Sequence, residues 1–242
     1  MFLIISIAHD GFSNEKRSNL ITTHRNIQLI ALSAPLNKEF DIPVMSQEQA
    51  LNVIRKSIDL IYAKSSYTAN RLDELRKSGP LIVIYNPQFP EWSRGDLTLA
   101  AFLPYHLDLD GNSLIQEAYV AVLGRYIIQH SAAEIAAEGI AHELVGHGFQ
   151  HRDGTLELLS GLNAECEASL YEMKAFQDLG VDMLSSHMVR FRLELEKHNC
   201  DDFRRFMGKR KKSLMYLWDQ KYIDVDYILR IFKDYEATLT KK

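Results

Sequence analysis

The stretch IAHELVGHGFQHRDG, Ile140 to Gly154, is rich in side chains that bind metal ions. It misses by one position the HExxH pattern, in which two histidines four residues apart on a helix bind one zinc ion. Here His142 and His147 are five residues apart, and Gly146 stands where the second ligand would be expected. The chemistry such a group could support is metal-assisted hydrolysis, provided that both imidazoles reach the same ion.

The five-residue spacing is compatible with one ion if the helix contains a π-turn. Residues five apart on a regular α-helix point about 140° away from each other, whereas residues four apart differ by only about 40°. A π-turn absorbs one extra residue and brings both histidines back to one face. Gly146 has little helix propensity and no side chain to crowd the bulge. We therefore predict a π-turn here, with His142 and His147 as two metal ligands.

A third ligand is expected because a catalytic zinc ion usually takes three protein ligands and leaves one position to water. The segment GLNAECEASLYEMKAF predicts a second helix that begins near Asn163. Glu165 lies on this helix, 18 residues after His147, and the intervening chain is long enough for a connection between packed helices. Glu165 is therefore the candidate third ligand. The expected inward face of this helix consists of Ala164, Ala168, Tyr171 and Ala175.

Two neighbouring residues offer alternatives. His151 is four residues after His147 and would chelate an ion with it on a regular helix, but that choice leaves Glu143 and Glu165 without a role. Cys166 follows the proposed ligand and is expected to be a small buried side chain more than a thiolate ligand. The sequence has only one other cysteine, Cys200. A count of two cysteines predicts no disulfide framework and is typical of a protein from a reducing compartment.

The string HELVGH resembles the HExxGH variant of the zinc metallopeptidases, known from the dipeptidyl peptidase III family, and AECEAS is similar to that family's EECRAE motif. The resemblance covers these two motifs and the link between them. It implies a Zn²⁺ cofactor and a general base, Glu143, that activates the zinc-bound water. It also implies a set of metal ligands, namely His142, His147 and Glu165.

The sequence departs from that family at Ala164 and Ser169, where EECRAE has glutamates. The carboxylate that would orient a ligand histidine is therefore missing from its usual position, and such partners matter 10- to 100-fold in metal affinity or activity. Glu172 and Asp153 are the two candidates to replace it. The chain is also far shorter than the two-lobed peptidase, and its ligand spacing is closer to that of the thermolysin-like Glu-zincins. The resemblance thus implies a compact Glu-zincin, similar more loosely to small bacterial effector-type metallopeptidases.

The expected function is a zinc-dependent peptide-bond hydrolase, a metalloendopeptidase with a protein or peptide substrate. The alternatives are a zinc hydrolase of a non-peptide amide or ester, and a non-catalytic metal-binding protein. A closed structural site would usually offer four Cys or His ligands, which argues against the last alternative. Three residues are candidates to stabilise the oxyanion: Tyr171, His187 and Tyr216.

These residues must be positioned by helices and strands that the sequence also predicts. The order of those elements predicts an α+β fold in one domain of 242 residues. Residues 1–130 form a sheet-containing half with an N-terminal helix, and residues 131–242 form a mainly helical, zincin-like half with the metal site. Ser46 and Gln49 form a capping box that begins a helix to about Lys64, and a second capping box at Ser131 and Glu134 precedes the zinc helix. The other expected elements are a helix over 68–77 and strands within 1–10, 27–35, 81–85, 97–103 and 114–124. The last strand is expected to be the sheet edge that receives an extended peptide.

Composition is that of an ordinary soluble globular protein, with 46% hydrophobic and 25% charged residues. A net charge of −4 gives no reason to expect nucleic acid binding, and no run approaches the roughly 18 apolar residues of a transmembrane helix. The basic run Arg204 to Lys212 is expected to be a solvated face, with contact to an acidic partner or membrane surface as the alternative. These features predict a cytoplasmic protein, while secretion or delivery as an effector stays open. The oligomeric state is not predicted.

Overall fold

The computed structural model describes residues 19–35, 38–89, 100–106, 116–129, 133–220 and 222–239. The strands are β1 (Leu20–His24), β2 (Ile27–Ala31), β3 (Leu81–Asn86), β4 (Ala100–His106) and β5 (Gln116–Gly124). The α-helices are α1 (Gln47–Lys64), α2 (Ser66–Ser78), α3 (Arg125–Gln129), α4 (Ala133–Ile140), α5 (Gly148–Arg152), α6 (Gly161–Leu179), α7 (Ser186–Glu194), α8 (Asp201–Arg210) and α9 (Val225–Leu239). Two π-helical segments, η1 (Ala141–His147) and η2 (Leu195–Asn199), and a 3₁₀ helix, η3 (Lys212–Leu217), complete the described elements.

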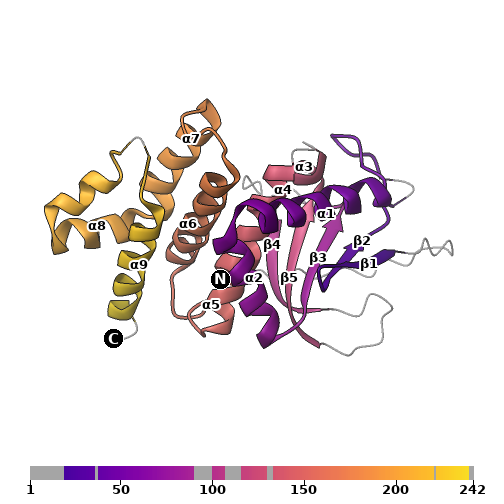
Figure 1. The fold of residues 1–242 in the computed structure, drawn as a ribbon, viewed down its shortest axis with the longest axis horizontal. Coiled ribbons are helices and arrows are strands. Elements are labelled where there is room, and N and C mark those ends of the chain that lie inside the picture. The colour runs from indigo at the N-terminus through magenta and orange to yellow at the C-terminus, as the bar shows by residue number, and fades with distance from the viewer. Residues whose placement is uncertain are drawn as a thin grey trace.

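The strands form one mixed sheet in the order β1-β2-β3-β5-β4. Neighbours among β2, β3 and β5 are parallel, whereas β1 and β4 run antiparallel to their neighbours. Two residues, Arg25 and Asn26, connect β1 to β2 with φ angles of 49° and 59°, which is the left-handed backbone of a type I′ hairpin turn. The mixed sheet followed by helices confirms the predicted α+β fold (Figure 1).

Strand β3 is buried on both faces of the sheet. Leu81, Val83 and Tyr85 contribute to the main hydrophobic core on the helical side. Ile82 and Ile84 point to the opposite face and join a second, smaller cluster. A near-continuous apolar run of this kind is expected for a parallel strand in the middle of a sheet.

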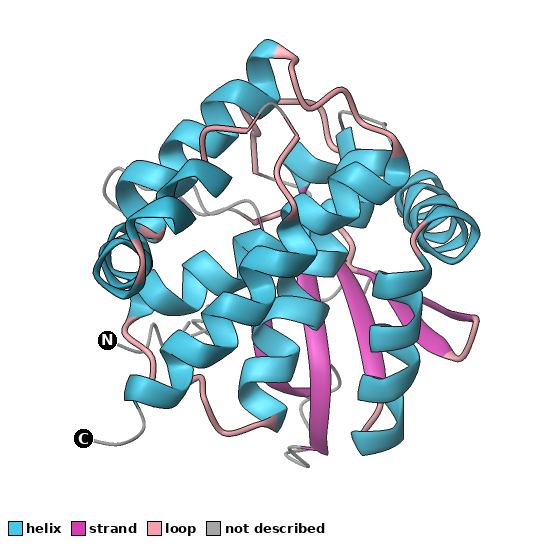
Figure 2. Ribbon diagram, turned by 60° about the vertical axis from the view of Figure 1, so that its left-hand side comes forward, coloured by secondary structure: helices cyan, strands magenta, loops and turns pink. Residues whose placement is uncertain are grey.

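Helices cover one face of the sheet, and the helical half continues beyond it (Figures 1 and 2). Helix α1 begins at the capping box that the sequence predicts, because Ser46 and Gln49 exchange side-chain to backbone hydrogen bonds. Its apolar residues Leu51, Ile54 and Ile58 are buried in the main core. The expected strand within 1–10 and the N-terminal residue of the second capping box, Ser131, lie outside the described residues.

The expectation about the sheet edge is wrong. Strand β5 pairs with β3 on one side and β4 on the other, so it lies inside the sheet. Among the described strands the edge beside β5 is β4, which carries Pro104 at a register irregularity between Leu103 and Tyr105. An edge strand or bulge is where a proline is tolerated in a sheet, because its nitrogen cannot donate to a neighbour.

The expectation about the two cysteines is also wrong. Cys166 on α6 forms a disulfide with Cys200, which precedes α8, and their Cα atoms are 4.9 Å apart. Both residues are fully buried. The 34 residues that separate them in sequence gave no sign of this proximity, because only the folding of α7 and η2 back against α6 brings them together. Since disulfides persist mainly in oxidising compartments, the cysteine count is no longer an argument for a reducing one.

Candidate metal centre

The helix that carries both histidines contains the predicted π-turn. Segments α4, η1 and α5 follow one another with right-handed helical dihedrals at both junctions, Ile140 and Gly148, so they form a single helix. Within it the backbone N–H of Gly148 donates to the carbonyl of Glu143, five residues earlier, which is the π pattern. The imidazole rings of His142 and His147 lie on the same side, with centroids 5.0 Å apart.

Gly146 is required by the neighbouring helix as well as by the bulge. A Cβ atom at this position would lie 2.6 Å from Cβ and 2.7 Å from Cα of Ala168 on α6. Because the obstructing atoms belong partly to the backbone, they cannot turn aside as a flexible side chain would. The absence of a side chain at Gly146 therefore lets α6 approach η1 closely.

Helix α6 presents Glu165 to the two histidines. It begins two residues before the predicted start, because Ser160 caps it by accepting from the backbone N–H of Asn163. Nε2 of His142 is 3.3 Å from one oxygen of Glu165, and Nε2 of His147 is 3.4 Å from the other. The three candidate ligand atoms all lie within 4.8 Å of one another.

The distances from the two histidines to the Glu165 carboxylate are close to those between ligand atoms around a zinc ion. Tetrahedral zinc with bonds of about 2.0 to 2.1 Å places its ligand atoms about 3.3 Å apart, close to the nitrogen to oxygen distances between the two histidines and Glu165. Two imidazole nitrogens and one carboxylate oxygen are also a donor set that catalytic zinc accepts, with a fourth position left over. The residues present therefore fit the ion that the motif implies.

Glu172 supplies the carboxylate that is missing from the usual position. Its Oε2 atom lies 2.8 Å from Nδ1 of His142, and both side chains are largely shielded from solvent. Glu172 follows Glu165 by seven residues, which returns it to nearly the same face of α6. The other candidate, Asp153, is exposed and accepts instead from Arg152 at 2.8 Å.

His147 has a different partner, which the sequence did not predict. Its Nδ1 atom lies 2.9 Å from Oε1 of Gln150, which is buried. The amide nitrogen of Gln150 donates to the carbonyl oxygen of Ala164 at 2.8 Å and to Glu167 at 3.1 Å. The only sequence signal was the spacing of three residues, which places a glutamine on the same helix face as His147.

The charges in the cluster favour proton binding by the histidines in the metal-free protein. Burial lowers the pKa of His142, but its contacts with the carboxylates of Glu165 and Glu172 outweigh burial and raise this pKa well above the usual value. Burial also lowers the pKa of His147, and its contact with Glu165 reverses the direction. Burial raises the pKa of Glu165, yet the two histidines lower it further, so this carboxyl stays ionised. An imidazole must lose its proton to bind a metal ion, so protons compete with the ion here.

Glu143, the candidate general base, is 5% exposed. Burial raises its pKa, while the neighbouring His142 and His147 act in the opposite direction. A second carboxyl, Glu138, lies one helical turn before His142, and burial together with the charge of Glu172 raises its pKa well above the usual value. One oxygen of Glu138 is buried without a hydrogen-bond partner among the described residues.

The rival ligands do not join the cluster. The ring of His151 packs near Phe102 and Tyr119, with centroid distances of 5.9 and 6.1 Å. Cys166 is held in the disulfide and offers no thiolate. The fold therefore brings Glu165, and not His151, to the two histidines His142 and His147.

None of the three candidates for oxyanion stabilisation has a hydrogen bond with the cluster in the described part of the chain. The hydroxyl of Tyr171 lies 3.3 Å from Arg71 and 3.4 Å from Glu167. His187 packs edge-on against Phe176, and Tyr216 lies in η3 with 64% of its surface exposed. The structure thus leaves this role without an assigned residue.

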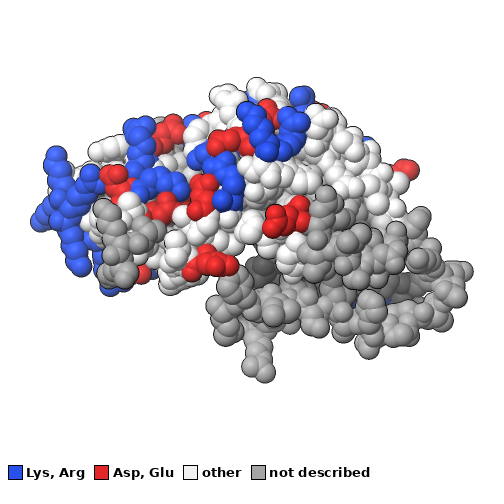
Figure 3. All heavy atoms as spheres, turned by 90° about the horizontal axis from the view of Figure 1, so that it is seen from below, with Lys and Arg blue, Asp and Glu red and all other residues white. Residues whose placement is uncertain are grey.

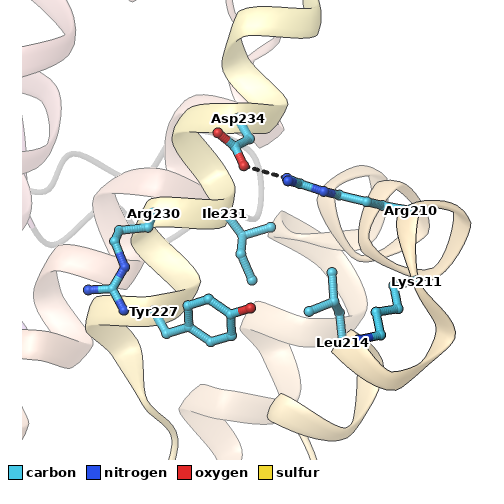
Figure 4. A pocket seen from close by; sticks show the side chains of 7 residues that line it. All are labelled: Arg210, Lys211, Leu214, Tyr227, Arg230, Ile231 and Asp234. Atoms are coloured by element: carbon cyan, nitrogen blue, oxygen red, sulfur yellow. Dashed lines mark hydrogen bonds and ion pairs between the residues drawn. The ribbon is translucent and has the colours of Figure 1, made fainter.

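The basic run Arg204 to Lys212 lies at the end of the molecule formed by α8, where Lys and Arg side chains gather (Figure 3). Beside it is a hollow of about 310 Å³ between α8, η3 and α9 (Figure 4). An ion pair between Arg210 and Asp234 crosses its rim, and Leu214, Tyr227 and Ile231 form its apolar part. The hollow is built from elements other than η1, which carries both candidate metal-binding histidines.

Comparison of the chain with protein-family models, curated proteins and solved structures found no match. None of the described helices is long and apolar enough to cross a membrane. Function is therefore inferred from the geometry of the candidate metal centre.

Proposed function

We propose that this protein is a zinc-dependent metallopeptidase of the Glu-zincin type, which hydrolyses peptide bonds. The observation that carries the proposal is the convergence of His142 and His147, through the π-turn, on the carboxylate of Glu165. These three residues would hold Zn²⁺, and Glu172 and Gln150 would orient the two imidazoles. Zinc supplies, when bound, a Lewis acid that polarises a carbonyl group and acidifies water.

Glu143 is the residue that would move the proton. It follows His142 directly in the π-helical segment and is buried beside the cluster. Burial raises its pKa above the usual carboxyl value, a direction that suits a group that must both accept and return a proton. Glu143 would take a proton from the attacking water and deliver it to the nitrogen of the leaving amine.

A peptide is the favoured substrate because of the neighbouring edge strand. The side of β4 that faces away from β5 has no pairing partner among the described strands, and we propose that an extended chain pairs with it there. The ring of Phe102 on β4 lies near that of His151, just after the metal-binding segment, which places this strand alongside the zinc helix. Strand β4 also contacts η1, so a peptide added to β4 would lie next to the element that carries both candidate histidines.

The test combines metal analysis with proteolysis. Purified wild-type protein should contain close to one zinc ion per chain, His147→Ala should lose it, and Glu143→Gln should retain it. New peptide termini should appear by mass spectrometry when a cell lysate is treated with wild-type protein but not with Glu143→Gln. Removing a general base typically costs a factor of about 100 to 10,000 in rate.

Glu157→Gln is a suitable control, because this exposed carboxyl in the link between α5 and α6 has no ion pair in the described part of the chain. It should retain both zinc and activity. Wild-type protein without zinc would overturn the proposal. Retained zinc with no peptide cleavage, but with hydrolysis of small amides or esters that depends on Glu143, would favour the non-peptide hydrolase instead.

A further inference from the structure

His147 stands at one end of a chain of buried polar contacts that reaches the last described helix. Oε1 of Gln150 lies 2.9 Å from the Nδ1 atom of this histidine, Glu167 accepts from the amide of Gln150 at 3.1 Å, and Lys233 on α9 lies 2.7 Å from the other oxygen of Glu167. Glu167 is 1% exposed and Gln150 is 2% exposed. None of these three partners would touch a metal ion or a substrate through the contacts described.

The contacts determine which way the amide of Gln150 faces. Its nitrogen meets two groups that can only accept, the carbonyl of Ala164 and the ion-paired carboxylate of Glu167. Turning the amide over would place its oxygen against both acceptors and would remove the Gln150 donor from Oε2 of Glu167, which is costly in the interior. The amide oxygen must therefore face Nδ1 of His147.

This orientation in turn selects the tautomer of His147. An imidazole that faces an amide oxygen through Nδ1 must carry a hydrogen there, so the lone pair of a neutral ring is left on Nε2. Nε2 is the atom that lies 3.4 Å from Glu165 in the candidate metal centre. The chain of contacts thus presents the correct nitrogen to the ion.

We propose that Lys233 and Glu167 are positioning residues of the metal centre, which hold Gln150 in the single orientation that directs Nε2 of His147 at the ion. This inference rests on the proposed zinc site and extends it to the C-terminal helix. Lys233 supplies only donors, and its ammonium group engages one oxygen of Glu167 as an acceptor while the amide of Gln150 engages the other. The side chain of Lys233 is 43% exposed, so the chain of polar contacts that starts at His147 reaches the protein surface at Lys233.

A purely structural role is the competing explanation, because removing the partner of a buried carboxylate such as Glu167 destabilises a fold whatever lies beyond it. The variants are therefore Glu167→Gln, Lys233→Met and the double variant Glu167→Gln/Lys233→Met, in which neither member of the pair keeps its charge. Lys233→Arg is the conservative rescue. Glu236→Gln is the matched control, because Glu236 contacts Lys233 at 2.9 Å without contacting Gln150 in the described residues.

The readouts are the zinc dissociation constant of the full chain, by competition with a chromogenic chelator, and the visible absorption spectrum of the Co²⁺-substituted protein. Both single variants and the double variant should bind zinc about 10-fold more weakly, at the lower end of the range for residues that orient ligands. Their Co²⁺ spectra should also change. Lys233→Arg should recover most of the affinity, and Glu236→Gln should match the wild type.

Lower thermal stability with unchanged zinc affinity and an unchanged Co²⁺ spectrum in the double variant would overturn the positioning role while leaving the proposed function intact. Equal loss of affinity in Glu236→Gln would also overturn it, because any disturbance of α9 would then have the same effect. Failure of the wild type to bind zinc is a different result, and it removes the metal site itself.

Discussion

Nδ1 of His142 lies 2.8 Å from Oε2 of Glu172, a carboxylate two helical turns beyond the candidate ligand Glu165 on the same face of α6. One helix thus provides both a candidate metal ligand and the carboxylate that contacts another candidate ligand. A carboxylate in this role fixes the ring and makes the imidazole a stronger donor.

Substitution of Glu172 should weaken metal binding without removing a ligand. We expect Glu172→Gln to raise the zinc dissociation constant about 10- to 100-fold, because the carboxylate partner of His142 is lost. A competition titration with a chelator measures this directly. Asp153→Asn serves as the control, since that carboxylate engages Arg152 instead, and equal losses in both variants would refute the assignment.

His151 should be dispensable for metal binding. Its ring lies among Phe102 and Tyr119, outside the cluster. His151→Ala should therefore keep the wild-type zinc content, whereas His142→Ala should lose the ion. Metal analysis of the two variants by atomic absorption decides between the observed cluster and the three-histidine alternative, which predicts the loss of zinc from His151→Ala.

Gly146→Ala should disturb the contact between η1 and α6. The added Cβ would lie within 2.7 Å of Cβ and Cα of Ala168, so the two helices must separate. Overpacking of this kind typically costs about 1 to 3 kcal/mol of unfolding free energy, and urea denaturation measures it.

Gly161→Ala is the matched control for that substitution, because an added Cβ there meets no atom within 4 Å. It should leave stability unchanged or slightly raised, since alanine has the higher helix propensity. A similar loss in both variants would show that the close approach at Ala168 is not the cause.

The disulfide between Cys166 and Cys200 should contribute substantially to stability. It closes a loop with a sequence separation of 34 residues, for which the chain-entropy model gives about 3 to 4 kcal/mol. Reductant, or the double variant Cys166→Ala/Cys200→Ala, should lower the urea midpoint accordingly. Titration of two free thiols in unreduced native protein would contradict the pairing.

Zinc affinity should fall as the pH falls, and the decline should begin above the ordinary histidine pKa of about 6.5. The sign follows from the raised pKa values of His142 and His147 in the metal-free protein, which keep protons bound to a higher pH than usual. Chelator competition at a series of pH values, corrected for protonation of the chelator, measures the effect. An affinity that stays constant across the neutral range, down through the ordinary histidine pKa, would contradict it.

Local signals in the sequence predicted much of the helical framework. The capping box at Ser46 begins α1, and the apolar run at 81–85 forms β3, as predicted. The hairpin of β1 and β2 was less visible, because its turn uses Arg25 and Asn26 without the glycine that usually marks such a turn. The position of β5 inside the sheet could not be read either, because strand order depends on pairing between distant segments.

In the candidate site too, local features could be predicted from the sequence, whereas contacts between distant segments could not. The spacing of His142 and His147 predicted the π-turn, because helix geometry alone requires it for one shared ion. The contact of Gln150 with Glu167 and the Cys166–Cys200 disulfide were not predictable, because both depend on how α6 packs against its neighbours. Roles that arise from tertiary contacts leave little trace in a single sequence.

The π-helical segment also bears on how such a site could arise. One residue inserted into a regular helix rotates the residues before it by about 100° relative to the residues after it, unless a bulge absorbs the change. Here the bulge spans Ala141–His147, and both imidazoles remain directed at Glu165. A helix with the four-residue histidine spacing could therefore gain one residue between its ligands without losing the ion. The two spacings would then be related by a single codon insertion.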